Sequence, residues 1–166
     1  MAEYDTQQVC KNGHQITDGY DIYPEQRKEF CPDCGEATLT NCPDCDGNVQ
    51  GGQFEVVTDW NGSQRYNRVA KPADVPSYCM NCGKPYPWTQ KKIVTAIQIL
   101  TEFGDLEASE KETIEQDVEN IARDVPESEL SAGRIARVLK RCGRVGYGVI
   151  MELASSTAAK ILRDPC

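Results

Sequence analysis

Eight residues in the first half of the chain have the types and spacing of metal ligands. Three pairs of cysteines are each separated by two residues, and a cysteine followed four positions later by a histidine makes a fourth pair. The eight are Cys10, His14, Cys31, Cys34, Cys42, Cys45, Cys79 and Cys82. A Cys-x-x-Cys spacing lets both thiolates reach one ion at about 2.3 Å. Four such half-sites predict two tetrahedral structural zinc sites.

The residues around these pairs support the metal interpretation. Gly35 and Gly83 follow their cysteine pairs and can take the positive-φ turn that aims backbone N–H groups at the sulfurs. Asn12-Gly13 can form the corresponding turn in the first half-site. His14 is the single histidine of the chain, and its position after that turn indicates a ligand.

Four half-sites can combine into two sites in three ways. We favour the sequence-order pairing, Cys10/His14 with Cys31/Cys34 and Cys42/Cys45 with Cys79/Cys82, because loop closure costs least for neighbouring segments. A cross-braced pairing, in which the first half-site joins the third and the second joins the fourth, remains the main alternative. A disulfide framework or a redox dithiol fits less well, because nothing in the sequence indicates an oxidising compartment or a βαβ unit around one pair.

Composition points to a cytoplasmic protein. The first residues show no signal peptide, and no apolar stretch of about 18 residues is present to span a membrane. The formal net charge is −8, and seven thiolates with two zinc ions would bring it to about −11. Such acidity disfavours a phosphate backbone as partner.

The pattern of the chain predicts an α+β protein with two domains, 1–87 and 88–166. In the first we expect a polar lead-in over residues 1–9 and a short strand or loop over 16–27. Residues 53–58 alternate like a half-buried strand, Asn61-Gly62 indicates a type I′ hairpin turn, and 64–69 can return antiparallel. Pro85 and Pro87 predict a stiff joint after the last cysteine pair.

The second domain is predicted to be a four-helix bundle. The first helix spans 89–103 and stops at Gly104, and the second starts at a capping box formed by Ser109 and Glu112 and ends before Pro126. Ser131 is expected to cap the third helix, and the fourth covers 146–162.

Three features of these helices carry further expectations. Cys142 falls on the apolar stripe of the third helix, so we interpret it as a buried thiol and not as a ligand. Small residues at Gly146, Gly148, Ala154 and Ala158 allow close helix contact, either within the bundle or across a homodimer.

Charge is also segregated along the helices: residues 101–129 are acidic and residues 130–163 are basic. We expect the two to face each other, although a row of bases on the third helix could instead meet an anionic partner. These bases are Arg134, Arg137, Lys140, Arg141 and Arg144.

The order of motifs resembles a known family. Cys10-x-Asn-Gly-His14, Phe30-Cys31-x-x-Cys34-Gly35, Cys42-Pro-x-Cys45 and Tyr78-Cys79-x-x-Cys82-Gly83 lead into Tyr86-Pro-Trp88-Thr89. Over about residues 8–92 this run is similar to a bacterial zinc-ribbon family known as domain of unknown function 2321. The resemblance implies a zinc ribbon with a helical extension and brings no activity with it.

Three classes of function remain. A zinc-stabilised adaptor or regulatory protein that binds a protein partner fits best, because the metal supplies the fold and leaves loops free for contacts. A nucleic-acid-binding regulator is second, because zinc ribbons often serve that role but the first domain is acidic. An enzyme is least favoured, because four ligands fill each site and no further histidine is present for proton transfer.

Overall fold

The computed structural model describes residues 2–104, 106–142, 147–154 and 156–163. Within those residues the protein has two small antiparallel sheets and five α-helices, so it combines α and β structure. The chain divides into two compact units, Met1–Thr89 and Gln90–Cys166. Both sheets belong to the N-terminal unit.

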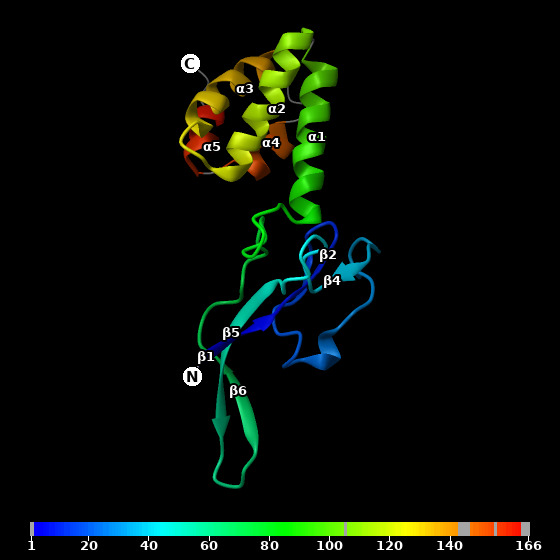
Figure 1. Ribbon diagram of the computed structural model, residues 1–166, viewed down its shortest axis with the longest axis vertical. Helices are drawn as coiled ribbons and strands as arrows, with labels where there is room; N and C mark the ends of the chain where they lie inside the picture. The colour runs from blue at the N-terminus through cyan, green and yellow to red at the C-terminus, as the bar shows by residue number, and fades with distance from the viewer. Residues whose placement is uncertain (1, 105, 143–146, 155, 164–166) are drawn as a thin grey trace. The chain divides into compact units, whose positions relative to one another are not determined.

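The first sheet contains β1 (Ala2–Thr6), β5 (Gln50–Thr58) and β6 (Gln64–Arg68), in the order β1-β5-β6 (Figure 1). The predicted lead-in over residues 1–9 is therefore wrong. β1 pairs with β5, with Glu3 opposite Phe54. Most β1 side chains are exposed, so the strand is held by backbone pairing and shows no apolar alternation that the sequence could reveal.

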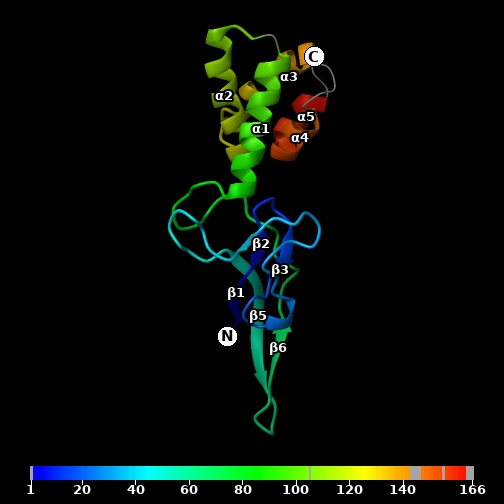
Figure 2. The same cartoon turned by 90° about the vertical axis from the view of Figure 1, so that its right-hand side faces the viewer.

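The second sheet contains β2 (Gln8–Cys10), β3 (Gln15–Thr17) and β4 (Thr38–Leu39), in the order β3-β2-β4 (Figures 1 and 2). A short 3₁₀ helix, η1 (Pro24–Gln26), follows β3. The central strand β2 is buried along its whole length. Just before it, the buried amide of Gln7 donates to the carbonyl oxygen of Gln50 at 2.6 Å, which ties this sheet to β5.

The β5–β6 hairpin has a different turn from the predicted one. Gly62 has a φ of 81°, but Asn61 does not have a positive φ, whereas a type I′ turn needs both. The Gly62 N–H donates to the Asp59 carbonyl at 2.9 Å, and the Asp59 N–H donates to Ser63 at 2.8 Å. This is a three-residue loop with glycine in the left-handed position. The Asn61 side chain instead accepts the Ser63 N–H at 3.0 Å.

The helical part differs from the prediction in its number of helices and in their starts. The helices are α1 (Pro87–Phe103), α2 (Ala108–Arg123), α3 (Ser128–Cys142), α4 (Tyr147–Leu153) and α5 (Ser156–Arg163). α1 begins two residues early because proline suits the first turn of a helix. The fourth predicted helix is two helices, α4 and α5, and Ala154, directly after α4, belongs to neither.

Two predicted caps are also replaced. The capping box of α2 pairs Glu107 with Glu110, not Ser109 with Glu112. The side chain of each glutamate accepts a hydrogen bond from the backbone N–H of the other glutamate. Ser131 lies inside α3, where its hydroxyl donates to the buried Asp117 carboxylate at 2.8 Å. Both errors have one cause, because several Ser and Glu residues near each start fit the capping pattern equally well.

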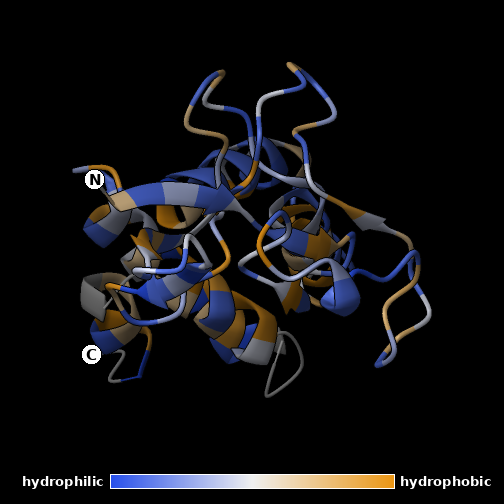
Figure 3. Cartoon of the chain, turned by 90° about the horizontal axis from the view of Figure 1, so that it is seen from below, coloured by the Kyte–Doolittle hydropathy of each residue, from blue (hydrophilic) through white to orange (hydrophobic). Residues whose placement is uncertain are grey.

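The helical unit has its own apolar core. Apolar residues of all five helices form one buried cluster that includes Leu100, Ile121, Ile135 and Ile150. Hydrophobic and hydrophilic stretches alternate along the helices, as expected for amphipathic segments (Figure 3). An ion pair links α2 to α3: the guanidinium of Arg134 forks onto the carboxylate of Asp117, which is fully buried.

No helix in the described ranges is both long enough and apolar enough to cross a membrane.

Some of the residues named in the sequence analysis lie outside the part of the chain that the structure describes. The side chain of Cys142 and the whole of Arg144, Gly146 and Cys166 are in this group.

Candidate metal centres

The fold gathers the eight proposed ligands into two clusters. One holds Cys10, His14, Cys31 and Cys34, and the other holds Cys42, Cys45, Cys79 and Cys82. Within each cluster the ligand atoms all lie within 4.8 Å of one another. This grouping is the sequence-order pairing and not the cross-braced alternative.

Distances between the ligand atoms fit a shared ion. The sulfurs of Cys10 and Cys34 are 3.8 Å apart, and so are those of Cys42 and Cys82. Four thiolates at about 2.3 Å from a tetrahedral zinc ion would stand about 3.8 Å from each other. A disulfide needs about 2.05 Å. The cysteines of both clusters are free, so the geometry fits metal coordination and does not fit cross-linking.

Every half-site is a miniature hairpin closed by two backbone hydrogen bonds, and the turn of the first is one residue shorter than the other three. In the second half-site, the Gly35 N–H donates to the Cys31 carbonyl and the Cys31 N–H donates to the Glu36 carbonyl, both at 2.8 Å. Isolated bridges flank the turns, at Phe30 with Ala37, Asn41 with Asn48 and Tyr78 with Pro85. In the first half-site the strands β2 and β3 take the place of such a bridge. The backbone therefore positions each pair of candidate ligands through local hydrogen bonds.

Three of these turns use glycine in the left-handed region, namely Gly13, Gly35 and Gly83 with φ of 94°, 71° and 71°. The half-site that starts at Cys42 uses Asp46 instead, with φ of 59°. Aspartate is one of the few residues with a side chain that tolerates this conformation. The positive φ at Asp46 was not predicted from the sequence, because the glycine there is displaced by one position to Gly47.

His14 joins the first cluster through its Nδ1 atom, which is 3.5 Å from the sulfur of Cys31. Two further groups surround the sulfurs: the backbone N–H of His14 donates to Cys10 at 3.3 Å, and the Asn12 amide donates to Cys34 at 3.5 Å. N–H donors aimed at sulfur stabilise thiolate charge. Asn12 therefore has a role in the site beyond that of a turn former.

Backbone donors shift the pKa values of individual ligands. The N–H of Glu36 lowers the pKa of Cys34 to about 6, and the N–H of Cys82 lowers that of Cys79 to about 6. At Cys45 the N–H of Gly47 also acts to lower the pKa, but desolvation and the neighbouring thiols outweigh it and raise the pKa to about 12. Thiolates held this close repel one another, and a divalent cation would offset that repulsion.

A small core lies beside the second cluster. Its buried members are Val9, Cys42, Val49, Cys79, Tyr86 and Trp88. Two of these six are candidate ligands, so the second cluster forms part of the hydrophobic packing of the N-terminal unit. Trp88 also reaches the first cluster's turn, because a Cβ added to Gly13 would lie 3.1 Å from the Cβ of Trp88. A metal ion bound at either cluster would therefore be coupled to the packing of this core.

Fold and site together define a small α and β protein with two Cys/His clusters that can hold metal ions. A family model described as an uncharacterised protein conserved in bacteria, DUF2321, matches residues 3–162. The protein belongs to that family. No curated protein and no solved structure matches the chain.

Proposed function

We propose that the protein is a non-catalytic adaptor in which two structural zinc ions hold a ribbon-like N-terminal unit, and that its β5–β6 hairpin binds a partner protein. The observation that carries the proposal is the exposure of the hairpin's apolar residues. Trp60, in the loop at its tip, is 99% exposed. Val56 and Tyr66 form a cross-strand pair and are 50% and 44% exposed.

This hairpin resembles an interface element in shape and composition. β6 and the distal part of β5 extend away from the other strands of the unit (Figures 1 and 2). All five β6 residues are exposed. Tryptophan and tyrosine supply much of the binding energy at protein interfaces, because they bury large rigid surfaces at low entropic cost. An indole left in water at a loop tip is therefore a plausible anchor for a partner.

Zinc is the metal we propose for both clusters. Sets of three cysteines with a histidine, or of four cysteines, at tetrahedral spacing are typical of structural zinc sites, in which no coordination position is left open. A reducing, cytoplasmic setting belongs to the same proposal, because the ligands must remain thiolates. The non-catalytic role follows from the closed ligand sets. His14, the one histidine of the chain, is used as a ligand.

A nucleic-acid-binding regulator is the second candidate, and the ion pairs of the N-terminal unit argue against it. On the hairpin, Arg65 pairs with Asp59 at 2.6 Å and Arg68 forks onto Asp18. Lys84 pairs with Asp44 at 2.6 Å. Cations neutralised within the unit contribute little to phosphate binding. Bases on α3 are among the remaining candidates for such contacts.

The experiment is recovery of partners with a tagged protein, followed by mass spectrometry. Trp60→Ala should weaken recovery of a specific protein, with a loss of affinity of roughly 30-fold if the indole is a central anchor. Tyr4→Ala is the matched control, because Tyr4 is an exposed aromatic residue on β1, outside the hairpin. Zinc content should be unchanged in both variants.

The outcome that favours the regulator is equally specific. Micromolar or tighter binding to DNA or RNA at physiological salt, abolished by Arg137→Glu with Arg141→Glu, would replace the adaptor proposal. Recovery of the same protein partner by wild type and Trp60→Ala in equal amounts would remove the hairpin from the interface.

A further inference from the structure

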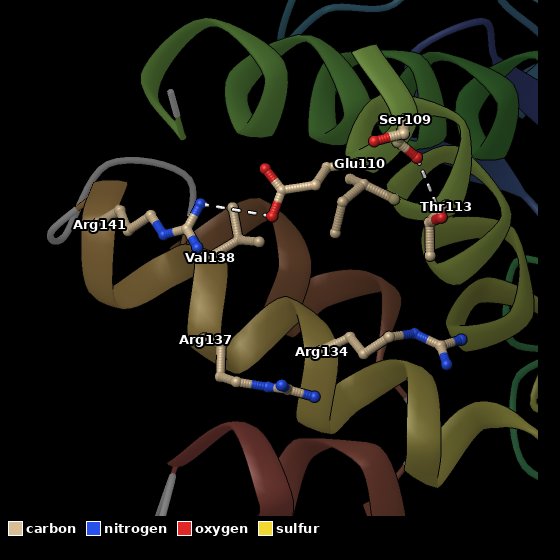
Figure 4. Close-up of a pocket in the computed structure, with 8 residues that line it drawn as sticks. Ser109, Glu110, Thr113, Arg134, Arg137, Val138 and Arg141 are labelled. Atoms are coloured by element: carbon tan, nitrogen blue, oxygen red, sulfur yellow. Dashed lines mark hydrogen bonds and ion pairs between the residues drawn. The ribbon is translucent and has the colours of Figure 1, made fainter. Parts of the chain in front are cut away.

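A cavity of about 420 Å³ lies between α2 and α3 in the helical unit. Its lining combines three arginines, a glutamate, two hydroxyl residues and two aliphatic side chains (Figure 4). These residues are Ser109, Glu110, Thr113, Ile114, Arg134, Arg137, Val138 and Arg141. The volume lies within the range of small-molecule sites, about 300–1,000 Å³.

The three arginines share one face of α3, at positions i, i+3 and i+7, but they are not equally neutralised. Arg134 is committed to the buried carboxylate of Asp117. Arg141 approaches Glu110 at 3.6 Å, an exposed pair of low strength. Arg137 makes one long contact, from Nε to the Gly133 carbonyl at 3.5 Å, and its terminal nitrogens have no acceptor among the residues that the structure describes.

The facing wall of the cavity comes from the start of α2. Ser109 and Thr113 are one turn apart on it, and the Thr113 hydroxyl donates to the Ser109 carbonyl at 3.3 Å. Hydroxyl groups can rotate to donate to a ligand oxygen. The positive end of the helix dipole adds a modest attraction for negative charge. Guanidinium groups on one wall of the cavity and hydroxyl groups on the other are the kinds of group that recognise a phosphate.

We propose that this cavity binds a phosphomonoester dianion. Arg137 would hold two phosphate oxygens through its forked N–H groups, and Arg141 would exchange its weak contact with Glu110 for the ligand. Arg134 would stay on Asp117 and support the wall. Two arginines match the charge of a dianion better than that of a carboxylate or a phosphodiester, which carry one negative charge.

The source of the phosphate is either a small metabolite or a phosphorylated side chain. The cavity is larger than a phosphate group, so part of the rest of the molecule fits inside it. Ile114 and Val138 line it as well and would contact the carbon skeleton. The inference goes beyond the adaptor proposal, since it concerns the helical unit and depends on neither the hairpin nor the metal.

Titration of the zinc-loaded full-length protein tests the inference by calorimetry or by NMR. The probes are inorganic phosphate, glycerol 2-phosphate, a phosphoserine peptide and, as the monoanionic control, dimethyl phosphate. Saturable binding of the first three, with dimethyl phosphate at least tenfold weaker, is the expected result. Tighter binding of the peptide than of glycerol 2-phosphate would assign the source to a phosphorylated side chain, and the reverse order would assign it to a metabolite.

Arg137→Gln should weaken phosphate binding at least tenfold. The matched control is Arg123→Gln, which makes the same chemical change at an exposed position near the end of α2, outside the cavity. Equal affinities for Arg137→Gln and wild type, equal losses in both variants, or no saturable binding of any phosphomonoester would each overturn the inference.

Glu110→Gln provides a test with the opposite sign. Glu110 is the one acid that lines the cavity, and it competes with an anion for Arg141. Glutamine can replace glutamate in a capping box, so α2 should keep its start. Removing the charge should strengthen phosphate binding severalfold, a gain that simple loss of folding cannot produce. Unchanged or weaker binding would contradict the proposed arrangement.

Discussion

The indole of Trp88 stacks on the ring of Tyr86, with ring centroids 4.7 Å apart and planes inclined by 17°. Both residues are buried, and the Trp88 N–H donates to the Pro76 carbonyl at 2.8 Å. The stack lies among candidate ligands of the second cluster, and Trp88 lies against Gly13 in the turn of the first half-site. One aromatic pair thus joins both candidate metal sites through a common core.

Trp88→Ala should weaken metal retention in both sites. Loss of a buried tryptophan costs about 3–5 kcal/mol, and in this unit folding and metal binding are linked. We expect faster zinc transfer to a colorimetric chelator than in wild type. Trp60→Ala is the matched control, because that indole is exposed and its loss leaves no cavity. Equal transfer rates for the two variants would show that the stack does not support the sites.

Native mass spectrometry of the protein purified without chelator should show two zinc ions per chain. Cys31→Ser should remove the ion of the first cluster and Cys79→Ser that of the second, because serine is a poor zinc ligand at neutral pH. Cys142→Ser should keep both ions, since we assign Cys142 no role as a ligand. A mass shift of one metal in wild type, or retention of both ions by Cys31→Ser, would refute the ligand assignment.

Two substitutions in equivalent turns should differ in their effect on folding stability. Gly35→Ala places a Cβ at a φ of 71°, with no atom within 4 Å to clash, so its cost of about 1 kcal/mol is conformational. Asp46→Gly relieves the left-handed aspartate of the third half-site and should be neutral or slightly stabilising. Thermal unfolding of the zinc-loaded protein measures both, and a lower melting temperature for Asp46→Gly would point to a role for that carboxylate.

The ion pair of Asp18 with Arg68 should contribute more to the free energy of unfolding than the ion pair of Asp59 with Arg65. Asp18 is buried and also accepts the Ala73 N–H at 3.0 Å. Desolvation acts to raise the pKa of Asp18, but these hydrogen bonds outweigh it and lower that pKa. Asp18→Asn should cost about 1–3 kcal/mol, because it breaks a partly buried charged pair.

Asp59→Asn is the matched control for Asp18→Asn. Its partner Arg65 is 68% exposed, and exposed pairs contribute about 0–1 kcal/mol. Chemical denaturation of the zinc-loaded variants gives both values. Equal costs would mean that burial of Asp18 does not strengthen its pair.

The sequence anticipated the gathering of the half-sites better than it anticipated the fold around them. A Cys-x-x-Cys pair with a following glycine specifies its own backbone turn, so the candidate ligands could be identified from local spacing. The lower cost of closing the shorter loops favoured the pairing of neighbouring half-sites. By contrast, β1 has no apolar alternation, and Gln7 and Asp18 are buried through contacts with Gln50 and Arg68, about 40 to 50 positions away along the chain. Local patterns carry no information about such long-range partners.

Helix existence was likewise easier to predict than helix boundaries. The apolar stripes around Ile97, Val118 and Ile135 are long and periodic, so they identify helices. The first residue of a helix depends on which of several polar residues forms the N-cap. At α2 the N-cap is Glu107 and not Ser109. The metal identity, the partner and the independence of the two domains stay predictions.

A fragment covering residues 90–166 should keep its helical circular dichroism after chelation, whereas a fragment covering 1–89 should lose its structure. The buried cluster of the helical unit runs from Ile93 to Leu162 and includes none of the eight candidate ligands, so its packing does not depend on metal. In the N-terminal unit the core contains Cys42 and Cys79, and removal of the ions would leave repelling thiolates in place of a cross-link. The full-length chain should therefore lose part of its structure on chelation and regain it when zinc is returned. A C-terminal fragment that is unfolded on its own would show that the helices need the N-terminal unit to complete their core.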